Sequence, residues 1–234
     1  MRGQSNQRAL VLSPHPDDES LGCGGTIKLI TASGGQVDVI YSTSGENGFF
    51  PGDIPTPEAC RRMAARRESE ARQACSLLGV REVSFLHGRD RNLGSQPELY
   101  EPILDALSRK DYRSVFCPWP YDSHADHTAT YGLLHEALRR CAKKLDVWLY
   151  EVWSPLRFNI CLAIDSTIDA KMQALRAHES QIALLNYADA FHGLARYRSL
   201  FCPPARYAEA FFNCDSAALL NHEGIPWERV GAGV

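Results

Sequence analysis

The sequence lacks an excess of basic residues, long hydrophobic runs and paired cysteines, and each absence excludes a class of protein. Its 234 residues carry 25 Lys and Arg against 28 Asp and Glu, a net charge of −3, so the positive charge typical of nucleic-acid binders is missing. The first apolar run, residues 9–12, is too short for a signal-peptide core or a membrane span. The eight cysteines form no Cys-x-x-Cys pair, which indicates reduced thiols. We therefore predict a cytoplasmic protein without a nucleic-acid partner and without stable membrane insertion.

Short β-type runs alternate with helical stretches along the chain. This alternation is typical of an α/β fold with a mostly parallel sheet. Because no shift in composition marks a linker, we predict one domain over residues 1–234. The strands are expected at 9–12, 36–43, 82–86, 114–119, 147–152, 159–164 and 206–212, and the helices at 19–32, 58–78, 98–109, 126–144 and 168–185.

Two polar clusters each follow one of the predicted strands. Residues 13–19 read Ser-Pro-His-Pro-Asp-Asp-Glu, and residues 124–127 read His-Ala-Asp-His. Open α/β sheets bind their ligands at the carboxyl ends of the strands. We therefore expect the two clusters to meet in one site.

The first cluster has the spacing of a metal site. His15 and Asp18 lie three positions apart, so an imidazole nitrogen and a carboxylate oxygen can bind one cation. With His127 from the second cluster as third ligand, one coordination position stays open, as in catalytic zinc sites; a structural zinc site normally uses four protein ligands. We predict Zn²⁺, and Fe²⁺ stays open because two histidines and a carboxylate also suit ferrous iron.

The other polar residues of the clusters are assigned to proton transfer. Asp17, next to a ligand but free of the metal, is the predicted general base. His124 is predicted to stabilise the oxyanion or protonate the leaving amine, with Asp126 accepting its ring N–H. Asp122 is the alternative partner for that ring. Glu19 is expected to orient the histidine of the first cluster or to bond the backbone at the start of the helix.

Together the two clusters resemble the PIG-L/LmbE-like family of zinc-dependent N-deacetylases. The segments 15–19 (His-Pro-Asp-Asp-Glu) and 124–127 carry the resemblance, and Ser-Gly-Glu at 44–46, Arg-Glu at 67–68 and His-Glu-Ser-Gln at 178–181 extend it. It covers residues 8 to 185, most of the chain, which argues against chance agreement of one short motif.

The resemblance implies a Rossmann-like fold of three layers and hydrolysis of an N-acetyl group on a small amino-sugar conjugate, releasing acetate and a free amine. It implies the same metal-binding and proton-transfer roles as above, and it makes Arg67 and Glu46 candidate substrate contacts.

Two alternatives stay open. One is an amidase of the same family that cleaves a larger thiol-sugar amide. The other is a non-catalytic nucleotide-binding module of Rossmann type, motivated by the glycine-rich residues 22–25, although their spacing does not fit a dinucleotide-binding turn. The sequence leaves open the identity of the N-acetylated substrate, a homo-oligomeric state and the role of the segment after residue 185.

Overall fold

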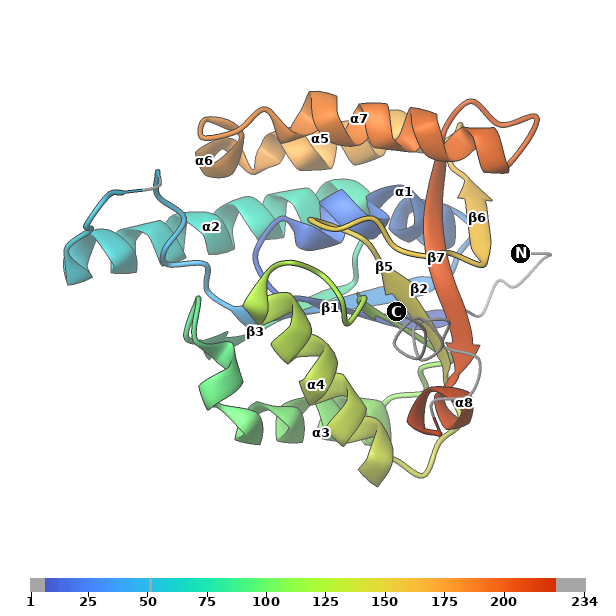
Figure 1. Ribbon diagram of the computed structural model, residues 1–234, viewed down its shortest axis with the longest axis horizontal. Helices are drawn as coiled ribbons and strands as arrows, with labels where there is room; N and C mark the ends of the chain where they lie inside the picture. The colour runs from blue at the N-terminus through green and yellow to red at the C-terminus, as the bar shows by residue number, and fades with distance from the viewer. Residues whose placement is uncertain (1–6, 51, 222–234) are drawn as a thin grey trace, which may run out of the picture.

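A seven-stranded sheet with the order β3-β2-β1-β4-β5-β7-β6 forms the centre of the computed structural model, which describes residues 7–50 and 52–221 (Figure 1). Strands β1 to β5 are parallel, and β7 runs antiparallel to both β5 and β6. The predicted α/β fold with a mostly parallel sheet is therefore confirmed. The strands are β1 (Arg8–Ser13), β2 (Gln36–Thr43), β3 (Glu82–Gly88), β4 (Ser114–Pro118), β5 (Asp146–Tyr150), β6 (Ile160–Ala163) and β7 (Ala208–Asp215).

Helices cover both faces of this sheet (Figure 1). Helices α1 (Asp18–Ala32) and α2 (Pro57–Leu78) lie on one face, and α3 (Tyr100–Arg109) and α4 (Ala125–Arg140) lie on the other. On the first face, α5 (Ile168–Ala177) packs against α1 and α2, and α7 (Tyr187–Arg198) lies beside it, so a further layer is added. The short helices are α6 (Glu179–Ile182), α8 (Ser216–Leu220), η1 (Leu93–Ser95), η2 (Pro97–Leu99) and η3 (Ser199–Phe201).

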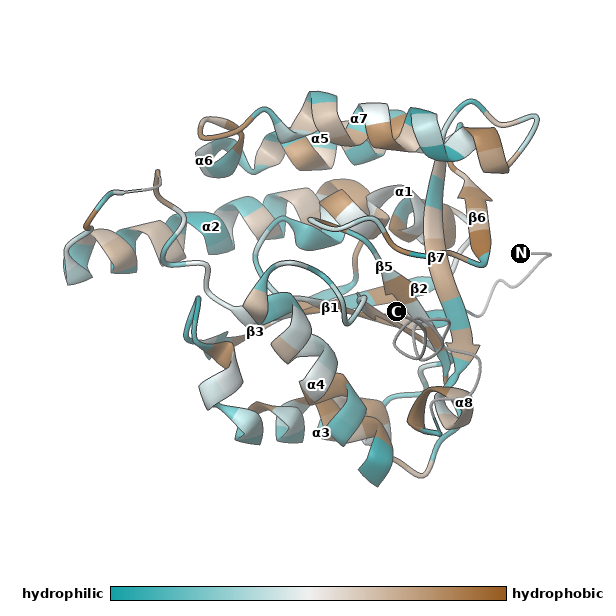
Figure 2. Cartoon of the chain, viewed as in Figure 1, coloured by the Kyte–Doolittle hydropathy of each residue, from teal (hydrophilic) through white to brown (hydrophobic). Residues whose placement is uncertain are grey.

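The apolar residues of the strands explain these layers. Strands β1 and β4 are buried along almost their whole length, as expected for parallel strands covered on both faces. One apolar cluster fills the space between the sheet and α1 and α2, and a second fills the space under α3 and α4. In Figure 2 the central strands are largely brown, whereas teal segments lie on the outer turns of the helices.

The C-terminal part departs most from the predicted elements. The helix expected at 168–185 breaks at His178 and resumes as the short α6, because His178 leaves the helical conformation (φ −82°, ψ 57°). Helix α7 has no predicted counterpart, since Phe191 is the only large apolar side chain among its buried residues, the others being Ala188, Ala195 and Arg198. None of the described helices is both long enough and apolar enough to cross a bilayer.

The strand order places the two polar clusters side by side. Strand β1 pairs with β2 on one side and with β4 on the other, so the connections leave in opposite directions from this point. Such a topological switch leaves a crevice at the carboxyl ends of the strands. The loops after β1 and β4 both open into it.

Candidate active site

The first cluster occupies the junction between β1 and α1, and its backbone is unusual at Asp17. This residue has φ 150° and ψ −28°, a conformation that side-chain-bearing residues rarely adopt. Strain of this kind costs about 1–3 kcal/mol and is concentrated at functional sites. Hydrogen bonds hold the turn, because Ser13 Oγ donates to the carbonyl of His15 at 2.8 Å and the amide of His15 donates to Asp18 at 2.9 Å.

The predicted metal-binding residues lie together in the structure. Asp18 Oδ2 is 3.1 Å from His15 Nδ1 and also 3.1 Å from His127 Nε2. All three side chains are buried. Two distant segments of the chain therefore place two imidazole nitrogens around one carboxylate oxygen.

The second nitrogen of each histidine faces a different carboxylate. His15 Nε2 is 3.2 Å from Asp126 and 3.3 Å from Asp90, and His127 Nδ1 is 3.3 Å from Asp122. Carboxylates in this position fix the tautomer and the orientation of metal-binding histidines. This pairing leaves His15 Nδ1 and His127 Nε2 as the nitrogens suited to a cation.

The pKa shifts show that this cluster favours positive charge. Burial disfavours a charged imidazole, yet hydrogen bonds to three carboxylates raise the pKa of His15 well above its usual value. Burial also opposes the charged form of His127, but the nearby Asp18 raises its pKa to about 9. The same negative surroundings would stabilise a divalent cation.

The hydrogen bonding of His127 also fits a metal ligand. Both ring nitrogens are buried, and neither makes a well-aligned hydrogen bond among the described residues. A buried polar atom without such a bond costs about 1–3 kcal/mol, and a metal bound at one nitrogen would account for it. Among the described residues, two groups bring candidate ligand atoms all within 4.8 Å of one another, namely His15 with His124 and His127, and His15 with Asp90 and Asp126; Asp18 belongs to neither group.

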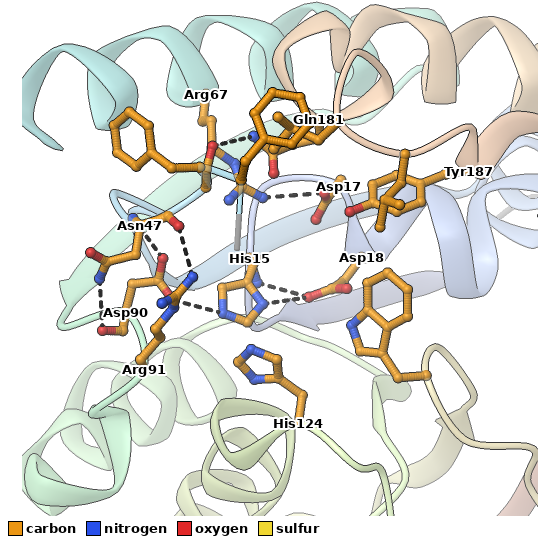
Figure 3. A pocket seen from close by; sticks show the side chains of 16 residues that line it. His15, Asp17, Asp18, Asn47, Arg67, Asp90, Arg91, His124, Gln181 and Tyr187 are labelled. Atoms are coloured by element: carbon orange, nitrogen blue, oxygen red, sulfur yellow. Dashed lines mark hydrogen bonds and ion pairs between the residues drawn. The ribbon is translucent and has the colours of Figure 1, made fainter. Parts of the chain in front are cut away.

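Asp17 points into the same pocket and is held by Arg67 (Figure 3). Arg67 Nη2 is 3.2 Å from Asp17 Oδ2, and the guanidinium donates to the carbonyls of Gly45 (3.1 Å) and Pro16 (2.9 Å). Burial raises the pKa of Asp17 to about 6, although the charge of Arg67 opposes this rise. Arg67 therefore joins two loops around Asp17. Arg67, a predicted substrate contact, also lines the pocket.

His124 caps the start of α4. Its Nδ1 accepts a hydrogen bond from the amide of Asp126 at 3.2 Å. Because this nitrogen is an acceptor, the proton of the neutral ring lies on Nε2. Burial, reinforced by the nearby imidazoles, lowers the pKa of His124. The neutral ring thus offers an N–H donor at the pocket.

The contact predicted between Asp126 and the ring N–H of His124 is wrong, and so is its alternative with Asp122. The Asp126 carboxylate accepts from the amides of Arg91 (2.6 Å) and Leu93 (3.1 Å) and faces the histidine of the first cluster. Asp122 accepts from the backbone amide of His124 at 3.0 Å and faces the last histidine of the second cluster. The physical reason is the helix cap. His124 Nδ1 accepts the hydrogen bond from the backbone amide of Asp126, so this nitrogen carries no proton to donate to a carboxylate.

Glu19 and Glu46 both make positioning contacts. Glu19 accepts from the amide of Asp17 at 3.2 Å, as one of its two predicted roles required, and its other oxygen is 3.2 Å from His178 Nε2. Within the described residues, no hydrogen bond or ion pair joins it to His15, which it was alternatively expected to orient. Glu46 accepts from the amide of Asp90 at 3.0 Å and does not line the pocket.

A pocket of about 280 Å³ lies over this cluster, close to the lower end of the size range of ligand sites. Several residues that line it are absent from the sequence-based prediction. Asp90 and Arg91 follow β3, and a polar run after a third parallel strand could have indicated them. The C-terminal part contributes Gln181, which lies in the segment 178–181 of the family resemblance, and four residues that no local signal marks, namely Trp153, Leu184, Leu185 and Tyr187.

The fold and the site together define an α/β protein of Rossmann-like type with a buried histidine–aspartate cluster at a topological switch point. Comparison with known proteins gives the family. Residues 10–138 match PIG-L, described as GlcNAc-PI de-N-acetylase, so the chain belongs to this family, as its motifs predicted.

Two relatives in sequence are named as deacetylases, and a solved structure has the same fold. Diacetylchitobiose deacetylase of Thermococcus kodakarensis is 31% identical over 75% of this chain and 70% of its own length. The probable N-acetyl-alpha-D-glucosaminyl L-malate deacetylase 2 of Bacillus anthracis is 28% identical over 77% of this chain and 84% of its own. N,N'-diacetylchitobiose deacetylase from Pyrococcus horikoshii, with 24% identity, superposes with a TM-score of 0.81 over 96% of this chain and 88% of that chain. That structural likeness shows a common fold.

Proposed function

We propose that this protein is a metal-dependent N-deacetylase that removes the acetyl group from a small N-acetylglucosamine-type conjugate. The proposal rests on the position of Asp18 Oδ2 at the base of a pocket. This oxygen lies 3.1 Å from a nitrogen of His15 in the first cluster and 3.1 Å from a nitrogen of His127 in the second. The names of the relatives support the reaction, since one is named a diacetylchitobiose deacetylase and the other a probable N-acetyl-alpha-D-glucosaminyl L-malate deacetylase.

His15, Asp18 and His127 are the residues that would hold the metal. Their donor set, two imidazole nitrogens and one carboxylate oxygen, suits Zn²⁺ and also Fe²⁺. A metal bound there would lower the pKa of a water molecule and polarise the acetamido carbonyl. We favour Zn²⁺, and we place the protein in the cytoplasm; both remain predictions.

The remaining residues would carry the proton transfers. Asp17 accepts a proton from the attacking water, whose oxygen bonds to the carbonyl carbon. His124 donates its Nε2–H to the carbonyl oxygen as negative charge develops there. Asp17 then returns the proton to the leaving nitrogen, the C–N bond breaks, and acetate and the free amine leave. Arg67 keeps the Asp17 carboxylate in place throughout.

The test combines metal analysis with product analysis. The purified protein is expected to contain about one zinc or iron per chain and to release acetate from N-acetylglucosamine conjugates, with activity lost on chelation and restored by metal. Release of a larger acid without acetate would favour the amidase. Tight binding of a dinucleotide by a metal-free, inactive protein would instead support the nucleotide-binding module.

A further inference from the structure

Three large apolar side chains are exposed at the mouth of the pocket. Phe50 is 55% exposed, Trp153 is 40% exposed and Leu185 is 56% exposed, and all three line the pocket. They come from three separate segments, namely the loop after β2, the loop after β5 and the segment between α6 and α7. We refer to these three residues as the apolar mouth.

A convergence of this kind differs from scattered surface leucines. Single exposed apolar side chains are common, whereas a group of them at the rim of a polar pocket typically marks a ligand surface. The surface continues inward, because Leu184 and Tyr187 line the same pocket and the rings of Tyr187 and Trp153 meet edge to face with centroids 5.4 Å apart. The apolar side therefore extends from solvent to the base of the pocket.

Asn47, Asp90 and Arg91 lie on the side of the pocket away from Tyr187 (Figure 3). The backbone N–H of Asn47 donates to the Asp90 carboxylate at 2.9 Å, and the Arg91 guanidinium donates to the backbone carbonyl of Asn47 at 3.1 Å. The view places Tyr187 near Asp17 and Asp18, away from this polar group. A ligand that fills the pocket would meet hydrogen-bonding groups at Asn47 and Arg91 and aromatic rings at Trp153 and Tyr187.

We propose that the substrate is an amino-sugar conjugate with an apolar substituent, an aryl ring or an alkyl chain, that packs against the apolar mouth. The inference rests on the proposed deacetylation, since the acetamido group must lie over His15 and Asp18. The sugar hydroxyls face Asn47 and Arg91, and the substituent leaves along Trp153 toward solvent. A substituent carrying a carboxylate would instead be drawn to Arg91.

Acetate release should be compared for four compounds: free N-acetylglucosamine, its 4-nitrophenyl glycoside, its octyl glycoside and a glycoside with a carboxylate-bearing substituent. We expect kcat/KM for the aryl and octyl glycosides to exceed that for the free sugar at least ~10-fold, since each buried methylene adds a few-fold. Equal values for all four compounds, or a preference for the carboxylate, would overturn the proposal.

Variants locate the effect at the apolar mouth. Phe50→Ser and Leu185→Ser are expected to reduce the octyl-to-free-sugar ratio of kcat/KM about 5-fold or more. Ile54→Ser is the matched control, because Ile54 lies in the same loop, is 97% exposed and does not line the pocket. An unchanged ratio in both mouth variants would refute the assignment.

Calorimetric binding separates this inference from the proposed function. If no compound releases acetate, the deacetylase proposal fails, yet tighter binding of the octyl glycoside to the native protein than to Phe50→Ser would still support the apolar mouth. If acetate is released and binding is indifferent to the substituent, only the apolar mouth fails.

Discussion

The two edges of the parallel sheet use buried carboxylates in opposite ways. At the amino edge, the carboxylate of Asp38 is fully paired: Arg81 donates to its two oxygens at 2.9 and 2.6 Å, Tyr112 donates at 2.6 Å and Lys110 donates at 3.3 Å. At the carboxyl edge, Asp18 faces two histidines and Asp17 has a strained backbone.

This difference separates stability from chemistry. A carboxylate that is matched by two cations and a phenol lowers the free energy of the folded state and offers no atom for reaction. Carboxylates crowded around imidazoles are tolerated because they would bind and orient a cation, and such arrangements are typical of functional sites. Substitutions at the carboxyl edge should therefore affect activity, and substitutions at the amino edge should affect stability.

The largest effect is expected for Asp18→Ala. This variant removes the oxygen shared by both histidines, so it should lose the metal together with essentially all acetate release. Metal analysis after dialysis and an activity assay at several metal concentrations would measure both losses. A variant that keeps stoichiometric metal and near-native turnover would rule out the proposed ligand set.

Asp17→Asn is expected to keep the metal and to lower kcat about 10²–10⁴-fold, the range for loss of a general base. Its shape is nearly unchanged, and the amide can still contact Arg67. Metal content and kcat, measured side by side, separate it from Asp18→Ala. Parallel loss of metal and rate would show that Asp17 is itself a ligand.

His124→Gln is expected to keep the metal and to lower kcat about 10²–10³-fold, as found when one oxyanion donor is removed. KM should change little, because the hydrogen bond strengthens only as charge develops. This variant also decides between ligand sets: if the metal is lost, His124 belongs with His15 and His127 as a ligand, a group whose candidate ligand atoms lie within 4.8 Å of one another.

Asp122→Asn is expected to weaken metal affinity or activity about 10–100-fold, the usual effect of removing a carboxylate that orients a metal-binding histidine. The carboxylate faces His127 Nδ1 and also accepts from the amides of His124 and Trp153. Titration with a competing chelator would give the affinity. If the metal affinity equals the native value, Asp122 does not orient the histidine and only accepts hydrogen bonds from the two backbone amides.

Asp38→Asn is expected to leave the acetate-releasing activity unchanged and to lower the free energy of unfolding by about 1–3 kcal/mol at neutral pH. Although burial opposes it, the hydrogen bonds from Arg81 and Tyr112 lower the pKa of Asp38 in the folded state below 3.8. The stabilisation is therefore fully present above the unfolded pKa and is lost as the pH falls through the folded pKa.

Urea unfolding of the native protein and of Asp38→Asn at pH 7, 5 and 3 would follow this difference. It should be the same at the first two pH values and smaller at the third. A difference that grows as the pH falls would show that the sign assigned to the pKa shift is incorrect.

Much of the site could be predicted because its signals are local. His15 and Asp18 are fixed by a single turn, and a strand before a polar run indicates where that turn lies. The partners of Asp126 and the wall that includes Tyr187 could not be predicted in the same way. They depend on which loops meet across the switch point, and residues separated by many positions leave no spacing to recognise.

The amino-acid order by itself determined the alternating strands and helices, the motif at residues 15–19 and the kind of chemistry those side chains can perform, because these follow from short-range periodicity and from the functional groups themselves. Only the tertiary structure decided which nitrogen of each histidine faces Asp18, which carboxylates support the rings and which apolar residues surround the pocket mouth. Those choices depend on packing between distant segments, where distances of a few ångströms decide which contacts form.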